Sequence, residues 1–302
     1  MDEAEALKEH IREQYDELAE TWQRWTPVMG AQYAPATEMM LDLARIRPGD
    51  RVLDIAAGDG SQSIAAARRV GPTGHVLAVD IAREQLRYAA IAAREAGVEH
   101  LETRVMDAEN LDLPDASVDA VLCQFGLMFL PNVDRGLREM LRVLKPGSWA
   151  SLVIFAAGGT PESDVAESIV RRRVGIDAPA PVQGSGATLG MPEALKRRLE
   201  AAGFQTVEAH ELLVPFRLPS AADALAYIRD LHPTLVGMLA PLATDERDAV
   251  WREVEGALAS FVGANGYQSP NGIVVVAGAR PAKPGRQVAS AANATAESGS
   301  IA

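Results

Sequence analysis

Cysteine is almost absent from this sequence: Cys123 is the only one among 302 residues. A single thiol cannot close a disulfide within the chain or build a multi-cysteine metal site. Disulfide-stapled folds and zinc ribbons are therefore excluded, and no metal site is predicted. Cys123 itself stands in an apolar run, so we expect it to be a small buried side chain.

Long hydrophobic runs are also missing. A membrane-spanning helix needs about 20 consecutive apolar residues, whereas the longest apolar runs here, such as Trp149–Ala157, have the length of a strand. The N-terminus, MDEAEALKEH, is acidic and lacks the basic-then-apolar order of a secretory signal. We therefore predict a cytoplasmic protein that does not span a membrane.

Positive charge is in deficit, with 29 Lys and Arg against 41 Asp and Glu, for a net charge of −12. An acidic body repels a phosphate backbone unless a local basic patch overrides it, so nucleic acid is excluded as the expected partner. The composition, 48% hydrophobic and 23% charged, is that of an ordinary globular protein. We expect a small molecule as the partner, and the sequence leaves a homodimer open.

Short β-branched runs alternate with helical periods through the first half of the chain. The run Arg51–Ile55 leads into a glycine-rich loop and then an Ala-rich helix at Ser61–Val70. Such alternation predicts an α/β fold, a Rossmann-like doubly wound, mostly parallel sheet of seven strands. The further strands are expected at His75–Asp80, Leu101–Asp107, Ala120–Phe125, Trp149–Phe155, Gln205–Arg217 and Ile273–Ala279.

Composition and periodicity divide the chain into four regions. Apolar residues at helical spacing predict helices over 4–25 and 35–44, and two cap helices over 221–242 and 245–263. The regions are an N-terminal helical lid segment (1–46), a cofactor-binding core (47–157), the rest of the core with a helical substrate cap inserted before the last strand (158–280), and a disordered Ala/Ser/Gly-rich tail (281–302).

The loop Ala56–Gly60 joins the first strand to a helix. Glycines there let a ligand approach the backbone closely, beside the free N–H groups of the helix N-terminus. Asp80 ends the next strand 20 residues after Gly60, where doubly wound nucleotide sites place the acid that meets the ribose hydroxyls. Ser63 stands where a dinucleotide site wants its third glycine, which counts against NAD.

A further acid, Asp107, ends the third predicted strand. A carboxylate there can accept a hydrogen bond from an exocyclic amine such as that of adenine. Ligands of open α/β sheets bind outside the carboxyl ends of the strands, so these acids are expected to converge on one crevice. An acidic crevice suits a cationic ligand better than a pyrophosphate.

Five motifs in this order resemble the class I S-adenosylmethionine-dependent methyltransferases. The chain is similar in particular to the ubiquinone/menaquinone-biosynthesis C-methyltransferases and their small-molecule relatives. The resemblance covers residues 47–157, and it departs at Met106, where relatives more often carry Gly. The motifs are VLDIAAGDG (52–60), VDI (79–81), DAENLDLP (107–114), SVD (117–119) and RVLKPG (142–147).

The resemblance implies S-adenosylmethionine as the cofactor and a set of residues that bind it. It places Gln124 at the methyl end of the cofactor, although family members diverge in the stretch that follows. The other implied contacts are the loop residues Ala56, Gly58 and Gly60 with the methionine part, Asp80 with the ribose, Asp107 and Ala108 with adenine, Asp54 with the amino group, and Ile81 with the cofactor in general.

Three residues are candidates for a general base that ionises an acceptor: His232, Tyr15 and Tyr33. Each also has a plain structural interpretation, since aromatic residues at helical spacing commonly belong to a core and a histidine before a proline commonly caps a helix. Methyl transfer is an in-line displacement, so such a base is not required by the chemistry.

The predicted function is transfer of a methyl group to a small, apolar or aromatic acceptor, at carbon or oxygen, in quinone-type or secondary metabolism. The apolar cap segment Leu231–Pro241 favours such an acceptor. Two alternatives come from other classes: an NAD-dependent oxidoreductase, which would share the fold, and a non-catalytic protein that uses the methyltransferase fold to bind a partner.

Overall fold

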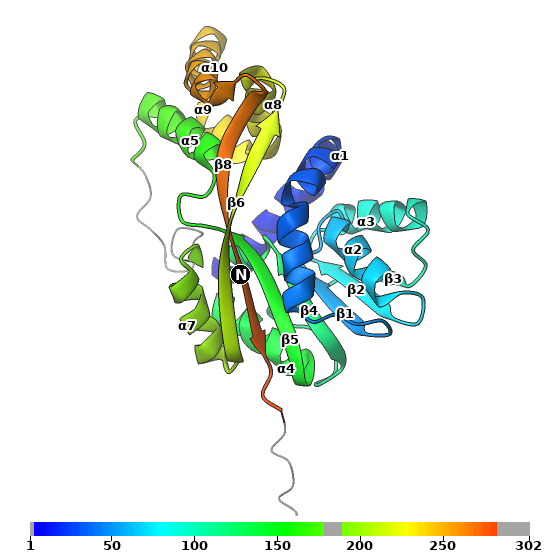
Figure 1. The fold of residues 1–302 in the computed structure, drawn as a ribbon. Helices are drawn as coiled ribbons and strands as arrows, with labels where there is room; N and C mark the ends of the chain where they lie inside the picture. The colour runs from blue at the N-terminus through cyan, green and yellow to red at the C-terminus, as the bar shows by residue number, and fades with distance from the viewer. Residues whose placement is uncertain (1–2, 178–188, 283–302) are drawn as a thin grey trace, which may run out of the picture.

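The computed structural model describes residues 3–177 and 189–282, and one mixed sheet runs through it. The strand order is β3-β2-β1-β4-β5-β8-β6, with the short β7 beside β8 (Figure 1). Strands β1 to β5 are parallel, whereas β8 is antiparallel to β5 and to β6. The predicted Rossmann-like sheet is confirmed. Its strands are β1 (Arg51–Ile55), β2 (His75–Asp80), β3 (Leu101–Val105), β4 (Val118–Gln124), β5 (Leu144–Phe155), β6 (Gln205–Leu218), β7 (Val262–Gly263) and β8 (Gly266–Ala279).

Alternate residues of the strands pack on opposite faces of the sheet. Val52 packs in the core that also contains Met40 and Ala66, whereas Leu53 packs in the core that contains Leu137 and Leu199. This follows from the two-residue repeat of a strand. The first face is covered by α1 (Glu3–Leu43), α2 (Ser61–Val70) and α3 (Arg83–Glu95), the second by α4 (Val133–Val143) and α7 (Pro192–Ala202).

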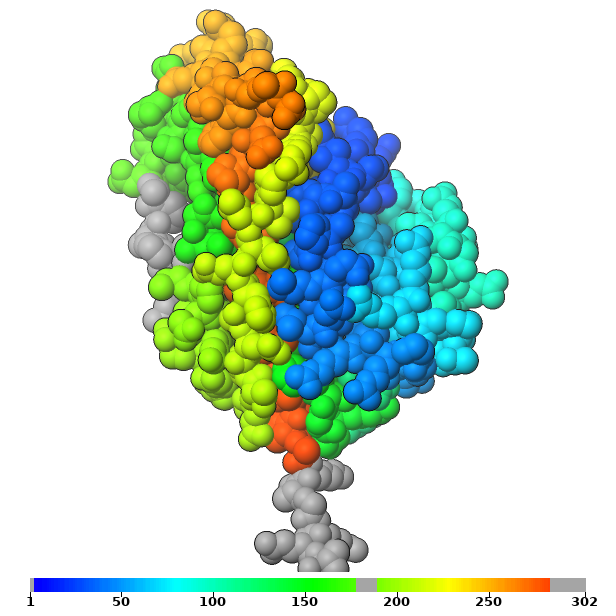
Figure 2. All heavy atoms as spheres, viewed as in Figure 1, coloured from blue at the N-terminus to red at the C-terminus, as the bar shows by residue number. Residues whose placement is uncertain are grey.

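The N-terminal segment is one helix, α1, so the prediction of two separate helices was wrong. Pro27 and Pro35 lie inside it, although each removes a backbone hydrogen bond. Burial offsets that loss, because Tyr33, Ala36 and Met40 are buried against the sheet. In Figure 2 the blue atoms of α1 form a continuous column between the yellow-green and the cyan parts of the molecule.

The antiparallel strands β6 and β8 are longer than predicted and extend beyond the rest of the sheet. Pairing continues from Gln205 opposite Ala279 to Leu218 opposite Tyr267. Figure 1 shows the cap helices at the far end of this strand pair, which confirms a helical cap before the last strand. They are α5 (Pro161–Val174), α8 (Ala221–Leu231), α9 (Pro233–Leu239) and α10 (Thr244–Leu258), followed by the 3-10 turn η2 (Ala259–Phe261).

Two cap helices differ from their predicted lengths. The helix expected over 221–242 is broken at His232, because Pro233 cannot continue a helix and instead begins α9. The helix expected to reach residue 263 ends at Leu258. From residue 283 on, the predicted disordered tail lies outside the described residues, as do residues 1–2 of the predicted lid segment.

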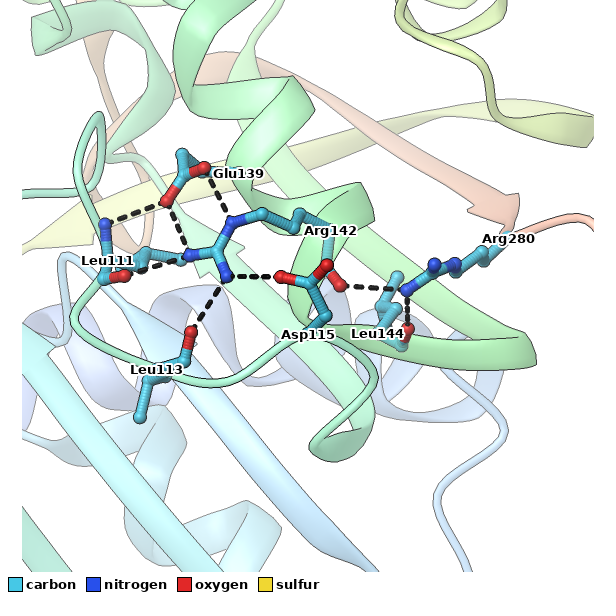
Figure 3. Close-up of polar contacts among 7 residues, drawn as sticks. All are labelled: Leu111, Leu113, Asp115, Glu139, Arg142, Leu144 and Arg280. Carbon is cyan, nitrogen blue, oxygen red and sulfur yellow. Dashed lines mark hydrogen bonds and ion pairs between the residues drawn. The ribbon is translucent and has the colours of Figure 1, made fainter.

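Arg142 braces the loop that follows β3 (Figure 3). Its guanidinium donates to the carbonyl oxygens of Leu111 (2.8 Å) and Leu113 (2.7 Å) and to the carboxylates of Asp115 and Glu139. Charge-assisted bonds of this kind are the strongest hydrogen bonds in proteins. The RVLKPG motif therefore has a structural role: it anchors α4 to the loop between the third and fourth strands.

Cys123 is fully buried on β4, as expected. Among the helices of residues 3–177 and 189–282, none has both the length and the apolar composition needed to cross a membrane.

Candidate functional site

A cavity of about 790 Å³ opens at the carboxyl ends of β1, β2 and β4, beneath α1 and the cap. It continues from the glycine loop to the cap helices as one space. Most of the predicted cofactor residues line it, namely Ala56, Gly58, Asp80, Ile81, Asp107, Ala108 and Gln124. The three candidate bases, Tyr15, Tyr33 and His232, line it too. Topology thus brings these residues together as expected for the crevice of an open α/β sheet.

Asp80 is fixed by the backbone around it. Its Oδ2 accepts the N–H of Gly58 at 2.9 Å, and its Oδ1 accepts the N–H of Ala82 at 2.9 Å. Burial raises the pKa of the Asp80 carboxyl, and these backbone donors oppose the rise. The carboxylate joins the glycine loop to the start of α3 while it faces the cavity, so it can accept further hydrogen bonds from a ligand.

Two predicted cofactor residues, Gly60 and Asp54, do not line the cavity. Gly60 has φ +80°, and a Cβ there would lie 2.8 Å from that of Ala89, so this glycine packs the loop against α3. Asp54 is fully buried below the loop, where the Ser63 hydroxyl donates to its Oδ2 and its Oδ1 has no hydrogen-bond partner among the described residues. Desolvation raises the pKa of Asp54 to about 7. Contact of Asp54 with a cofactor stays a prediction.

Asp107 has a cationic partner that sequence reasoning missed. Lys8 of α1 donates to Asp107 Oδ2 at 2.8 Å and lies 3.0 Å from Glu109 Oε2. Lys8 and Glu109 are 8% and 2% exposed, so their contact is shielded from water, whereas the Asp107 side chain is 30% exposed. The backbone N–H of Glu109 also donates to Asp107 at 2.8 Å. The sequence holds no signal for the pair, because 99 residues separate Lys8 from Asp107.

Helix α1 closes the cavity through several polar contacts. Thr26 donates to Asp59 in the glycine loop at 2.6 Å, and Thr37 donates to Gln124 at the end of β4 at 2.8 Å. The ring of Tyr15 lies 5.4 Å from that of Phe129, centroid to centroid. Burial raises the pKa of Tyr15 far above its usual range, so its phenol stays protonated at neutral pH. The position of α1 supports the proposal that this segment is a lid.

The other end of the cavity is aromatic. Phe125 stacks on Phe155 with centroids 4.4 Å apart, and Tyr33 meets Phe125 edge-on at 4.8 Å. Burial keeps the Tyr33 phenol protonated as well, by raising its pKa. The sequence analysis did not single out either phenylalanine, since strand ends carry aromatic residues for many reasons.

His232 lies at the junction of α8 and α9, with its Nε2 3.3 Å from the Ser163 hydroxyl. Burial lowers the pKa of the imidazole, so the ring is neutral at neutral pH and retains a free acceptor or donor. Within the described residues, no group of His, Cys, Asp and Glu has an arrangement suited to a metal ion. The groups that the site does present are hydrogen-bonding side chains, aromatic rings and carboxylates.

Comparison with known proteins agrees with the geometry. Residues 52–147 match the family model described as "Methyltransferase domain". A relative from Ralstonia pickettii, named ubiquinone/menaquinone biosynthesis C-methyltransferase UbiE, is 42% identical over 113 residues, which are 37% of this chain and 46% of that protein. The chain thus spans about half the length of the curated relatives it matches.

Two solved structures share the fold at low sequence identity. The YcgJ protein from Bacillus subtilis has a TM-score of 0.56 and 20% identity, over 83% of this chain and 100% of the other. The cyclase SpnF has a TM-score of 0.54 and 19% identity, over 89% of this chain and 97% of the other. These likenesses extend over most of the chain, beyond the matched domain, and they concern the fold alone.

Proposed function

We propose that this chain, which contains a class I S-adenosylmethionine-dependent methyltransferase domain, transfers a methyl group from S-adenosylmethionine to a small acceptor. The observation that carries the proposal is a single cavity with two chemically different ends. At one end Asp80, Asp107 and the glycine loop meet, and at the other end lie aromatic rings. A cavity with two such ends can hold two different ligands side by side.

The residues at the first end fit the cofactor. We assign the ribose hydroxyls to Asp80, whose two backbone donors leave lone pairs free toward the cavity, and the adenine amine to Asp107. Backbone groups of Ala56 and Gly58, with Ile81 and Ala108, would form the walls. The acidic lining complements the positive charge of the cofactor. S-adenosylmethionine supplies an electrophilic methyl group on a sulfonium centre.

The protein's own part in the reaction is to position the acceptor and exclude water. Alignment of two reactants contributes about 7–11 kcal/mol to lowering a barrier, without any catalytic group. Helix α1 and the cap enclose the cavity, and Gln124 and Phe125 mark the boundary between its two ends. Among the predicted bases, His232 is the one with a basic lone pair at neutral pH, because Tyr15 and Tyr33 hold their protons.

The acceptor is proposed to be small and apolar or aromatic, methylated at carbon or oxygen. The stacked rings of Phe125 and Phe155, with Met29 and Leu235 nearby in the lining, support this class. The name of the relative from Ralstonia pickettii supports a quinone-type acceptor. The net charge of −12 favours a small molecule over a nucleic acid. A cytoplasmic location and a homodimer stay predictions.

Calorimetric titration with S-adenosylmethionine, S-adenosylhomocysteine and NAD tests the proposal. We expect micromolar binding of the two sulfur compounds and none of NAD. Asp80→Ala removes the ribose acceptor and leaves two backbone N–H groups unpaired, so affinity should fall about 100-fold. Glu102→Gln, on the exposed edge strand, is the matched control and should bind normally.

Two results would contradict the proposal. Binding of NAD alone would favour the oxidoreductase alternative. No binding of any of the three would favour a non-catalytic protein of the same fold.

A further inference from the structure

Glu162 is a buried carboxylate that neither the motifs nor the predicted bases included. It lies in the first turn of α5, is 2% exposed and lines the aromatic end of the cavity. The Ser269 hydroxyl donates to its Oε2 at 2.7 Å, and the Asn271 amide donates to its Oε1 at 3.1 Å. Ser269 and Asn271 lie on β8 and are themselves fully buried.

Within residues 3–177 and 189–282, Glu162 forms no ion pair with a cationic side chain. A buried charge without a counter-ion is costly, and proteins retain one where a ligand or a function uses it. The two hydrogen bonds occupy about half of the four lone-pair directions of a carboxylate. Glu162 is thus held in place by donors on β8 and keeps acceptor capacity in a cavity-lining position.

The surroundings of Glu162 connect it to the end of the cavity where the cofactor is proposed to bind. The Tyr33 phenol interacts electrostatically with this pair, since Glu162 raises its pKa and Asn271 lowers it. Tyr33 in turn meets Phe125, which follows Gln124 at the end of β4. One layer of residues therefore runs from Glu162 to the boundary between the two ends of the cavity.

The rings beside Glu162 form an apolar wall and not a cage for a cation. Phe125 stacks face to face on Phe155 with an angle of 18° between the rings, and Tyr33 meets both of them at steep angles. Cation–π recognition needs ring faces that are open to the ligand. A flat aromatic acceptor that presents a hydroxyl to the carboxylate fits this arrangement better than an ammonium group.

We propose that Glu162 recognises the hydroxyl of a phenolic acceptor and takes up its proton during methyl transfer. The inference rests on the proposed function, because it describes the second ligand of the same site. The acceptor O–H bond breaks toward a Glu162 oxygen, and the methyl–sulfur bond breaks with its electron pair left on sulfur. In one course the methyl group bonds to the phenol oxygen, and Glu162 later releases the proton to water. In the other it bonds to a ring carbon, whose own hydrogen leaves as a proton to water while Glu162 returns its proton to the phenol oxygen.

Burial supports this role, because it raises the pKa of the Glu162 carboxyl, and a carboxylate with a raised pKa is a better proton acceptor. His232 is a less suitable partner for the hydroxyl, since its Nε2 is directed to Ser163.

The test measures whether a bound acceptor needs its hydroxyl. Protein saturated with S-adenosylhomocysteine is dialysed to equilibrium against beta-naphthol or its methyl ether, and the ratio of the two affinities is taken. We expect the affinity of the wild type for the naphthol to exceed its affinity for the ether at least about tenfold, because only the naphthol can donate a hydrogen bond to the charged carboxylate. Glu162→Gln should reduce this preference about tenfold, because a neutral amide replaces the charged acceptor.

Glu253→Gln is the control, because this cap carboxylate pairs with Arg172 and Arg173 on the outside of α5. Glu162→Asp provides a second variant if the amide perturbs folding. It retains the charge but withdraws the carboxylate by one methylene, so the preference should fall there too. Thermal unfolding of each variant identifies any general loss of structure.

Binding of S-adenosylhomocysteine, measured first, separates this inference from the proposed function. If it does not bind, the proposed function fails. If it binds, two results with these probes would overturn the role of Glu162: a wild type that does not bind the naphthol or does not prefer it to the ether, or a preference that is unchanged in both Glu162 variants. Naphthylmethylamine is an ammonium probe of similar shape, and tighter binding of it than of the naphthol would overturn the role as well.

Discussion

The two ends of the cavity are built in different ways. The cofactor end is formed mainly by residues at or just after the ends of strands β1, β2 and β3, so most of its groups belong to short stretches of sequence, and Lys8 of α1 is an exception. The acceptor end combines α1, α5, the cap and β8, which meet only in the folded chain: Glu162 and Asn271 are 109 residues apart. A local motif can thus specify the cofactor, whereas the acceptor is specified by tertiary packing.

The two ends also differ in the kind of donor that holds their carboxylates in place. At the cofactor end, the backbone N–H groups of Gly58 and Ala82 hold Asp80. At the acceptor end, side chains hold side chains, as in the contact of Ser269 with Glu162. Side-chain partners change with a single substitution, so this end can acquire a new specificity while the cofactor site stays intact. The predictions below test whether the two ends are separable in this sense.

The largest expected effect concerns Asp54, below the cofactor loop. Its pKa is raised to about 7 in the native state, so the folded protein binds this proton more tightly than the unfolded chain does. The free energy of unfolding should therefore fall as pH rises from about 4 to about 7, by up to about 4 kcal/mol. Urea unfolding across this range measures the slope.

Asp54→Asn removes the titrating group, so the decline between pH 4 and 7 should flatten, whereas exposed Asp112→Asn should leave it unchanged. An identical pH slope in Asp54→Asn and wild type would show that other groups cause it. At the acceptor end, Glu162→Gln should leave most of the pH slope of the unfolding free energy in place.

Two glycines of the same loop should respond differently. Gly60→Ala combines a positive φ with a Cβ 2.8 Å from that of Ala89, so it should destabilise the protein by about 3 kcal/mol. At Gly58, φ is +54° but no atom lies within 4 Å of the added Cβ. Gly58→Ala should therefore cost only about 1 kcal/mol in unfolding free energy. Equal losses in the two variants would mean that packing on α3 does not define this loop.

Arg142→Lys should cost about 2 kcal/mol of unfolding free energy. A lysine cannot reach Leu111, Leu113 and Glu139 together, because it lacks the planar fork of the guanidinium. Chemical denaturation measures the loss, with exposed Arg138→Lys on the same helix as the control. We expect affinity for S-adenosylmethionine to fall as well, since the braced loop follows Asp107. A stable variant with normal affinity would refute this role.

The smallest effect is expected at the contact between α1 and the cap. Trp25→Phe removes the indole N–H that donates to Asp230 at 2.9 Å, while it keeps the ring near Tyr227, so stability should fall by about 1 kcal/mol. Arg24→Gln, whose guanidinium lies 3.6 Å from the same carboxylate and is mostly exposed, should change stability little. Cofactor affinity should be normal in both. A large loss of cofactor affinity in Trp25→Phe would contradict the proposed separation of the two ends.

The sequence predicted the core of the fold well, because there each element carries its own signal. The strands β1 and β2 and the helix α2 match their predicted bounds residue for residue. Glycine loops, strand-end acids and β-branched runs are local features. They are predictable because they agree with one another and with the packing of a parallel sheet. The predicted cofactor residues around Asp80 meet in one cavity for the same reason.

Prediction was weakest where a distant partner decides the local structure. Two prolines indicate a break in the N-terminal segment, yet burial against the sheet keeps α1 continuous through Pro27 and Pro35. Conversely, the apolar period of 221–242 concealed the break at Pro233. Lys8 gave no signal at all, because its role depends on Asp107, which the fold brings to it.

The sequence by itself determined the fold class, the order of strands and helices and the position of the cofactor-binding loop, since these follow from patterns that repeat within a few residues. Only the tertiary structure decided how the cavity is closed and which groups line its acceptor end. Glu162 meets Ser269 and Asn271 because α5 packs against the extended part of β8. No sequence period or motif encodes this contact, because it joins segments that are distant in sequence and come together only when the chain buries its apolar surfaces.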